Sequence, residues 1–164
     1  AAGGLEYAEQ PCRDTVDLAV LRRKLQVPIA ADESLRLDAN PMMVRQLEAA
    51  DVAVLKVAPL GGISSAYELY KRLEMPAVVS SALDTSVGIY AGLRLASALA
   101  ELPYACGLAT GSLLQEDVID PPFRPVNGHL TLAQAVPERI PAASEPLRER
   151  WCQRLVRLST LLAS

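Results

Sequence analysis

Residues 52–59 read VAVLKVAP, an apolar run that only Lys56 interrupts. An apolar run of this length predicts a parallel strand that is buried on both faces. Three further segments have the same form, an apolar stretch that ends in polar residues. They are LEYAEQP at 5–11, PIAADES at 28–34 and PAVVSSA at 76–82.

The polar residues that end these four segments are spaced almost evenly, at intervals of 23, 24 and 24 residues. They are Glu9, Asp32, Lys56 and Ser80. A fifth segment, PYACGLAT at 103–110, follows at a similar interval. Each interval has the length of one strand–loop–helix–loop unit, and such a period indicates repeated architecture. Because all strands of a βα barrel end on one face, these polar side chains are expected to converge on one pocket.

The hydrophobic pattern predicts five strands and, between them, four helices. The strands are expected at 5–9, 28–31, 52–58, 77–82 and 104–109, and the helices at about 15–25, 41–49, 64–73 and 88–100. Asp14 or Thr15 is expected to cap the first helix, and Asp84 the last one. Five strands cannot close an eight-stranded barrel and would leave unpaired edges. The chain is therefore expected to be a fragment or one piece of a larger assembly.

The pattern changes after the fifth segment. One or two helical turns are expected at 112–118, and a turn at Asn127-Gly128 precedes a predicted short strand, HLTL, at 129–132. Near the C-terminus, apolar residues recur at the spacing of one helix face, namely Leu147, Trp151, Leu155, Leu158 and Leu162. This stripe is expected to dock on the chain's own core, with a partner-binding helix as the alternative.

Composition excludes several classes of function. The 164 residues carry a net charge of −3, and no basic tract indicates nucleic acid or an anionic membrane. The longest apolar runs are strand-sized, so no membrane span is expected. Nothing resembles a signal peptide. Three scattered cysteines, Cys12, Cys106 and Cys152, lack metal-binding spacing and fit reduced thiols in a cytoplasmic protein.

The residue types at the strand ends indicate a chemistry. Two carboxylates, Glu9 and Asp32, suit a hard cation such as Mg²⁺, although either could instead cap the helix that follows. A lysine in an apolar strand is costly without a counter-charge or a function, so Lys56 is either a general base, an electrostatic stabiliser or part of a structural ion pair. Ser80 could bind a substrate carboxylate, and Gly107 could let a backbone N–H approach a ligand.

Five ordered motifs in residues 4–132 carry a family resemblance: EYAEQP, AADES, VLKVAPLGG, VVSSALDTSVG and YACGLAT. Together they resemble the enolase superfamily and, within it, the actinobacterial o-succinylbenzoate synthases of menaquinone biosynthesis. The resemblance implies an α/β fold, the part of a modified TIM-type (β/α) barrel from its fourth strand to its eighth. It implies that residues 1–110 form the second half of the barrel and that residues 111–132 return to a capping domain. Residues 133–164 are then a C-terminal loop and amphipathic helix.

The resemblance also implies roles for single residues. Glu9 and Asp32 match metal ligands for Mg²⁺, and Lys56 matches a catalytic lysine that stabilises an enediolate by its charge. Ser80 and Gly107 match residues that hold a substrate carboxylate. The implied reaction is the syn dehydration of a small-molecule cyclohexadiene carboxylate to o-succinylbenzoate.

Some parts of the family pattern do not occur in these 164 residues. The family uses a third carboxylate ligand and a Lys-x-Lys motif whose second lysine removes the α-proton, and no Lys-x-Lys is present here. The chain alone is therefore expected to be inactive and to self-associate through its open edges. The alternatives are an N-acylamino acid racemase or other cycloisomerase of the superfamily, and a non-catalytic, self-associating half-barrel.

Overall fold

Residues 4–132 and 142–162 are described by the computed structural model. Four short strands form one parallel sheet in chain order, as predicted. They are β1 (Ala8–Glu9), β2 (Ile29–Ala31), β3 (Val52–Lys56) and β4 (Ala77–Ser80).

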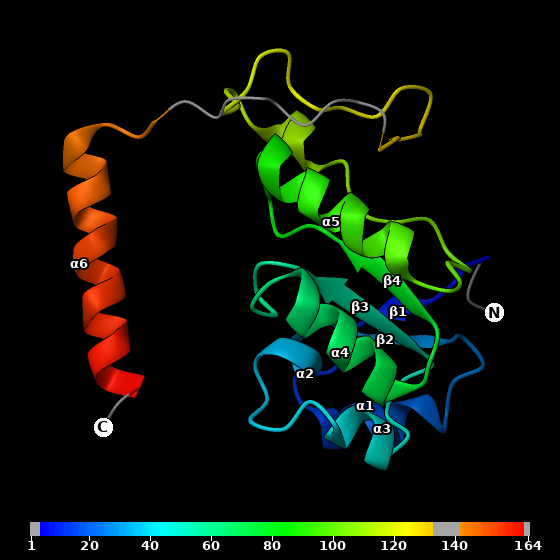
Figure 1. Cartoon of the computed structure of the whole chain (residues 1–164). Helices are drawn as coiled ribbons and strands as arrows, with labels where there is room; N and C mark the ends of the chain where they lie inside the picture. The colour runs from blue at the N-terminus through cyan, green and yellow to red at the C-terminus, as the bar shows by residue number, and fades with distance from the viewer. Residues whose placement is uncertain (1–3, 133–141, 163–164) are drawn as a thin grey trace.

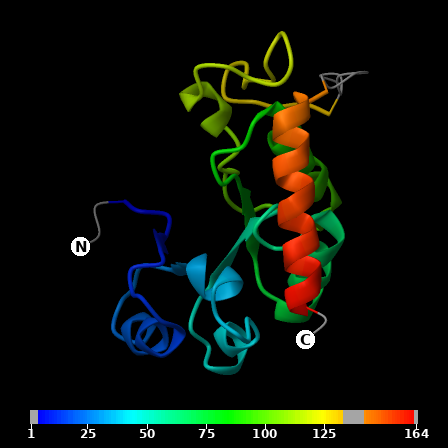
Figure 2. The same ribbon diagram turned by 90° about the vertical axis from the view of Figure 1, so that its left-hand side faces the viewer.

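Helices follow each strand and lie along one face of the sheet (Figures 1 and 2). They are α1 (Thr15–Arg22), α2 (Glu33–Arg36), α3 (Met43–Gln46), α4 (Ile63–Leu73) and α5 (Ser86–Ala98), followed by a 3-10 turn, η1 (Thr110–Leu113), and by α6 (Glu145–Leu162). Helix α4 packs on β3, and α5 packs on β4 and α4. The Asp14 carboxylate caps α1 by accepting from the N–H of Asp17, as expected.

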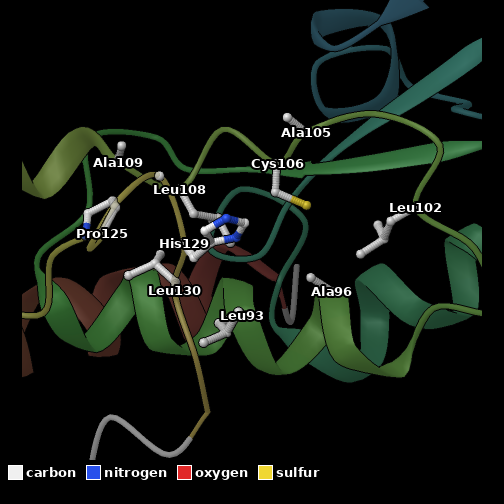
Figure 3. A pocket seen from close by; sticks show the side chains of 11 residues that line it. Leu93, Ala96, Leu102, Ala105, Cys106, Leu108, Ala109, Pro125, His129 and Leu130 are labelled. Atoms are coloured by element: carbon white, nitrogen blue, oxygen red, sulfur yellow. The ribbon is translucent and has the colours of Figure 1, made fainter.

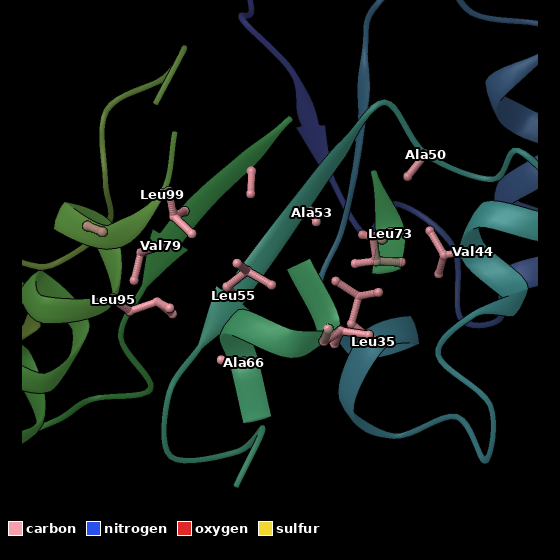
Figure 4. Close-up of a cluster of buried hydrophobic side chains, with 14 of the residues drawn as sticks. Leu35, Val44, Ala50, Ala53, Leu55, Ala66, Leu73, Val79, Leu95 and Leu99 are labelled. Atoms are coloured by element: carbon pink, nitrogen blue, oxygen red, sulfur yellow. The ribbon is translucent and has the colours of Figure 1, made fainter. Parts of the chain in front are cut away.

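The sheet is buried on both faces, and the strand residues alternate between two hydrophobic clusters. The larger cluster fills the space between sheet and helices and includes Leu55 and Val79 (Figure 4). The opposite face, called here the inner face, carries a smaller cluster of buried hydrophobic residues: Ala30, Val52, Val54 and Val78. Tyr7 and Tyr104 pack against this cluster, with their rings 5.1 Å apart, edge to face.

The fifth predicted strand, 104–109, is reduced to one parallel bridge between Ser80 and Gly107. Two hydrogen bonds hold it to β4: Gly107 N–H donates to Val79 O at 2.9 Å, and Ser81 N–H donates to Gly107 O at 3.0 Å. Among the described residues, no further strand pairs with this segment on its other side.

The expected strand HLTL is also absent. Val126 and His129 form a single antiparallel bridge across a tight turn, in which Asn127 and Gly128 have φ angles of 51° and 78°. Two positive φ angles in succession are typical of a type I′ hairpin turn. The expected helical turns at 112–118 occur slightly earlier, as η1.

Asp84 does not cap α5, contrary to expectation, because its side chain accepts instead from the N–H of Ala82. Asp117 caps the start of α5 instead, because its carboxylate accepts from both the N–H and the hydroxyl of Ser86. The Ser86 hydroxyl in turn accepts from the N–H of Phe123. This chain of hydrogen bonds ties the segment after η1 to the helix.

The C-terminal helix does not dock on the chain's core as expected. Every side chain described from 142 to 161 is exposed, and Figure 1 shows α6 standing apart from the sheet. Leu155, in the middle of the predicted stripe, is 63% exposed. The loop predicted before it falls mostly on 133–141, outside the described residues. No helix in the described parts of the chain is long and apolar enough to cross a membrane.

Candidate active site

The alternation of side chains along the strands decides where the polar strand ends point. In β3, Val52 and Val54 lie on the inner face, so Lys56, two positions further, lies there too. By the same alternation, Asp32 lies on the inner face with Ala30, and Ser80 lies there with Val78. A shift of one residue would place Lys56 among the helices instead. The period-2 pattern, together with the parallel register, therefore gathers these residues at one end of one face.

Lys56 is the centre of this group. Its ammonium nitrogen lies 2.5 Å from Asp32 Oδ2 and 3.9 Å from Glu9 Oε1. Its side chain is 14% exposed, and that of Asp32 is 3% exposed. Neighbouring strands thus bring the three predicted charged residues into one ion-paired cluster, and Ser80 lies directly opposite Lys56 in the register of β3 and β4.

The Asp32 carboxylate has a second cationic partner that the sequence analysis missed. Arg36 Nε lies 3.3 Å from Asp32 Oδ1, and the Arg36 guanidinium also pairs with Glu33. The signal was present in the sequence, because Asp32 and Arg36 are four residues apart, the spacing of helical ion pairs. Asp32 stands at the N-cap position of α2, yet its side chain makes no capping hydrogen bond.

The negative charge of Glu9 is less well balanced by nearby cations than that of Asp32. Burial raises its pKa above the ordinary value of 4.5, and the carboxylates of Asp32 and Glu33 act in the same direction, whereas the charge of Lys56 opposes them. Its side chain is still 42% exposed. The charged form of Glu9 is therefore less favoured than that of a carboxylate in water.

Gly107 does not offer its N–H to a ligand, because that group already donates to Val79 O. Its missing side chain has a different consequence. A Cβ at Gly107 would lie 2.6 Å from the Ser80 hydroxyl oxygen and 3.3 Å from Ser80 Cβ. Glycine at this position leaves room for the Ser80 side chain. The neighbouring Ser81 hydroxyl hydrogen-bonds to Gly107 O and Thr110.

An apolar pocket of about 480 Å³ lies away from this cluster, between α5 and residues 102–109 and 125–130 (Figure 3). Leu93 and Ala96 of α5 form one wall, and Cys106, Leu108 and His129 contribute to the others. None of Glu9, Asp32, Lys56 or Ser80 lines it. All three cysteines of the chain are free thiols.

The sequence matches a known family over most of its length. The family model described as "Enolase C-terminal domain-like" matches residues 1–138. The o-succinylbenzoate synthase of Mycobacterium tuberculosis (strain H37Rv) is 51% identical over 166 residues, which cover 99% of this chain and 51% of that protein. The o-succinylbenzoate synthase of Thermobifida fusca is 59% identical over 126 residues, covering 77% of this chain and 40% of that protein. The chain thus spans about half the length of the curated relatives it matches.

Solved structures resemble about three quarters of the chain. A muconate lactonizing enzyme from Pseudomonas fluorescens, complexed with muconolactone, has a TM-score of 0.72 and 25% identity, covering 77% of this chain and 36% of that one. An N-succinyl Arg/Lys racemase from Bacillus cereus has a TM-score of 0.64 and 26% identity, covering 70% of this chain and 32% of that one.

Proposed function

Because the chain belongs to the enolase C-terminal domain-like family, we propose that it forms the second barrel half of a cytoplasmic o-succinylbenzoate synthase. The observation that carries the proposal is Lys56, a lysine at the end of a buried strand, held between two carboxylates from neighbouring strands. The identity to mycobacterial synthases supports the choice of reaction. In this proposal residues 1–110 are the barrel half, 111–132 the return segment, and 133–164 the C-terminal loop and helix.

Glu9 and Asp32 are the residues that would hold a divalent cation such as Mg²⁺. The donor set fits, because oxygens of both carboxylates already converge on one cation, the Lys56 ammonium. Among the described residues, no third His, Cys, Asp or Glu completes a metal cluster. Bound there, the ion would supply electrostatic stabilisation of negative charge on a substrate carboxylate.

Lys56 is proposed to stabilise the enediolate that forms when the substrate loses the proton next to its carboxylate. Its ammonium is largely shielded from water, so its charge acts through a weakly screening medium. Charge stabilisation of this kind is commonly the largest single contribution to catalysis. Ser80, opposite Lys56, is proposed to bind a carboxylate of the substrate through its hydroxyl. Gly107 contributes by leaving space for that hydroxyl.

These 164 residues hold no counterpart of the base that removes the proton. The three lysines are Lys24, Lys56 and Lys71. Lys24 lies in the turn after α1, not within a helix as expected, and Lys71 lies on α4, where it pairs with Glu68. General-base catalysis contributes typically about 10²–10⁴-fold. The isolated chain is therefore expected to show no turnover.

A racemase acting on N-acylamino acids is the second candidate. The likeness to the N-succinyl Arg/Lys racemase, which covers 70% of this chain, favours it. Racemisation needs a base on each face of the substrate, and Lys56 would serve as one of them.

The test uses the protein translated from the whole gene, compared with the 164-residue chain and with Lys56→Ala in the longer protein. The longer protein is expected to form o-succinylbenzoate in a Mg²⁺-dependent reaction, followed by the ultraviolet absorbance of the aromatic product. Lys56→Ala should abolish it, with Lys71→Ala as the matched control. Clear turnover by the 164-residue chain, or racemisation of N-succinylamino acids without aromatic product, would contradict the dehydratase proposal.

A further inference from the structure

Gln10 directly follows Glu9 at the end of β1, and its side-chain amide reaches across to the start of α2. Gln10 Oε1 accepts from the backbone N–H of Asp32 at 2.9 Å and from that of Ser34 at 3.2 Å. Gln10 Nε2 donates to Ser34 Oγ at 2.9 Å and to Cys12 O at 3.1 Å. The partners fix the orientation of the amide, because backbone N–H groups only donate and the carbonyl of Cys12 only accepts.

The backbone of Gln10 is held in an unusual conformation. Its φ is +39°, in the left-handed region that residues other than glycine rarely adopt. Its own N–H donates to Ala30 O at 2.8 Å, which continues the pairing of β1 with β2. Strain of this kind persists only where surrounding contacts over-determine it. Here the contacts are the four hydrogen bonds of the side chain.

These hydrogen bonds replace a helix cap. Ser34 is the second residue of α2, and its N–H is one of the donors that an N-cap side chain normally satisfies. Asp32 occupies the N-cap position and is a residue type that caps well, yet its carboxylate points to Lys56 and Arg36 instead. It is free to do so because the Gln10 amide already satisfies the start of the helix.

We propose that Gln10 is a positioning residue that caps α2 in place of Asp32 and so keeps the Asp32 carboxylate directed, together with Glu9, at the cation site. The inference rests on the metal role proposed above for these two carboxylates. Without the amide, the N–H of Ser34 loses its acceptor. Asp32 is at the N-cap position, and its carboxylate can accept from that N–H by turning back onto its own helix and away from Lys56.

The test compares wild type with Gln10→Met, which keeps the length of the side chain but has no hydrogen-bond donor and only a weak acceptor, its sulfur. Mn²⁺ is the probe, and its affinity is measured by electron paramagnetic resonance in the full-length protein. Outer contacts to metal ligands typically change affinity about 10–100-fold, and a weakening in this range is expected. Asp14→Ala is the matched control, because it also removes a side-chain cap, that of α1, but contacts no proposed ligand. Its affinity should equal that of wild type.

A metal-free crystal structure of Gln10→Met separates this inference from the proposed function. The expected result is that the Asp32 carboxylate accepts from the N–H groups of α2 and leaves Lys56. That result would support the positioning role even if wild type bound no Mn²⁺, an outcome that would contradict the metal proposal alone. An Asp32 side chain that stays on Lys56, or Mn²⁺ binding that is measurable and equally tight in wild type and Gln10→Met, would overturn the inference.

Discussion

At the scale of single residues, the cluster is held together by compensation of charge. Asp32 is almost fully buried and pairs with two cations, Lys56 and Arg36. Glu9 is half-exposed and lies farther from the Lys56 ammonium than Asp32 does. A buried charge that loses its partner is costly, and its removal together with that partner costs much less. Lys56 and Asp32 are therefore coupled in stability as well as in the proposed chemistry.

Lys56→Met is expected to lower the free energy of unfolding by about 3 kcal/mol, because the buried Asp32 carboxylate loses its nearer cation and keeps Arg36, at 3.3 Å. A double variant, Asp32→Leu with Lys56→Met, is expected to recover most of this loss. Urea unfolding of the wild type, both single variants and the double variant gives the coupling energy. Additive losses would show that the two side chains do not stabilise each other.

The sequence was sufficient to predict which residues gather, because strand parity and the βα period are local properties. Glu9, Asp32 and Lys56 were found from their positions alone, although their roles remain proposals. Gln10 was missed, because a glutamine after a strand carries no periodic signal, and its four hydrogen bonds depend on contacts 2–24 residues away. The same applies to Asp117, which caps α5 from 31 residues further along the chain.

At the scale of elements, the opposite end of the sheet has a structural cluster of its own. Asp51, just before β3, accepts from Arg22 Nε at 2.9 Å and Nη2 at 2.6 Å, and from the N–H of Ile29 at 2.9 Å. It therefore joins α1 to the starts of β2 and β3. In βα barrels the chemistry lies at the C-terminal ends of the strands and the N-terminal ends serve stability. We expect Asp51 to matter for folding and not for metal binding.

Asp51→Asn is expected to lower the free energy of unfolding by about 1 kcal/mol at neutral pH, since the partly exposed pair is screened by solvent. Burial by itself would raise the pKa of Asp51, but the hydrogen bonds from Arg22 and Ile29 and the charge of Arg22 outweigh it and lower the pKa below 3.8. The stabilisation is thus present above 3.8 and is lost as pH falls through the lower folded value. Unfolding curves at pH 7 and below pH 3 test this. A difference between variant and wild type that does not change with pH would contradict it.

The fifth strand is an element that the sequence predicted in a more regular form than the structure shows. Its residues have the composition of a strand, but composition does not show that its pairing with β4 stops at a single bridge. Gly107 finds β4 on one side, and the described residues offer no strand on the other. Helix α6 shows the same limit: its apolar stripe was read correctly as a helix face, yet nothing in the stripe specifies what covers it.

At the scale of the whole molecule, the chain exposes surface that a complete barrel would cover. In the described part, β1 is paired on one side only, and the apolar residues of α6 face solvent, with Trp151 51% exposed. Unpaired parallel edges and contiguous apolar surface favour association. The 164-residue chain is expected to sediment as oligomers at micromolar concentration. A stable monomer over that range would contradict this expectation.

The central claim is that Glu9 and Asp32 form one cation site beside Lys56. Anomalous diffraction from crystals of the full-length protein grown with Mn²⁺ tests it most directly. We predict one strong peak in contact with an oxygen of Glu9 and an oxygen of Asp32, at about 2.1 Å from each, with the Lys56 ammonium no longer bridging the two carboxylates. A Mn²⁺ ion bound elsewhere in the barrel, with Lys56 still between Glu9 and Asp32, would contradict the account.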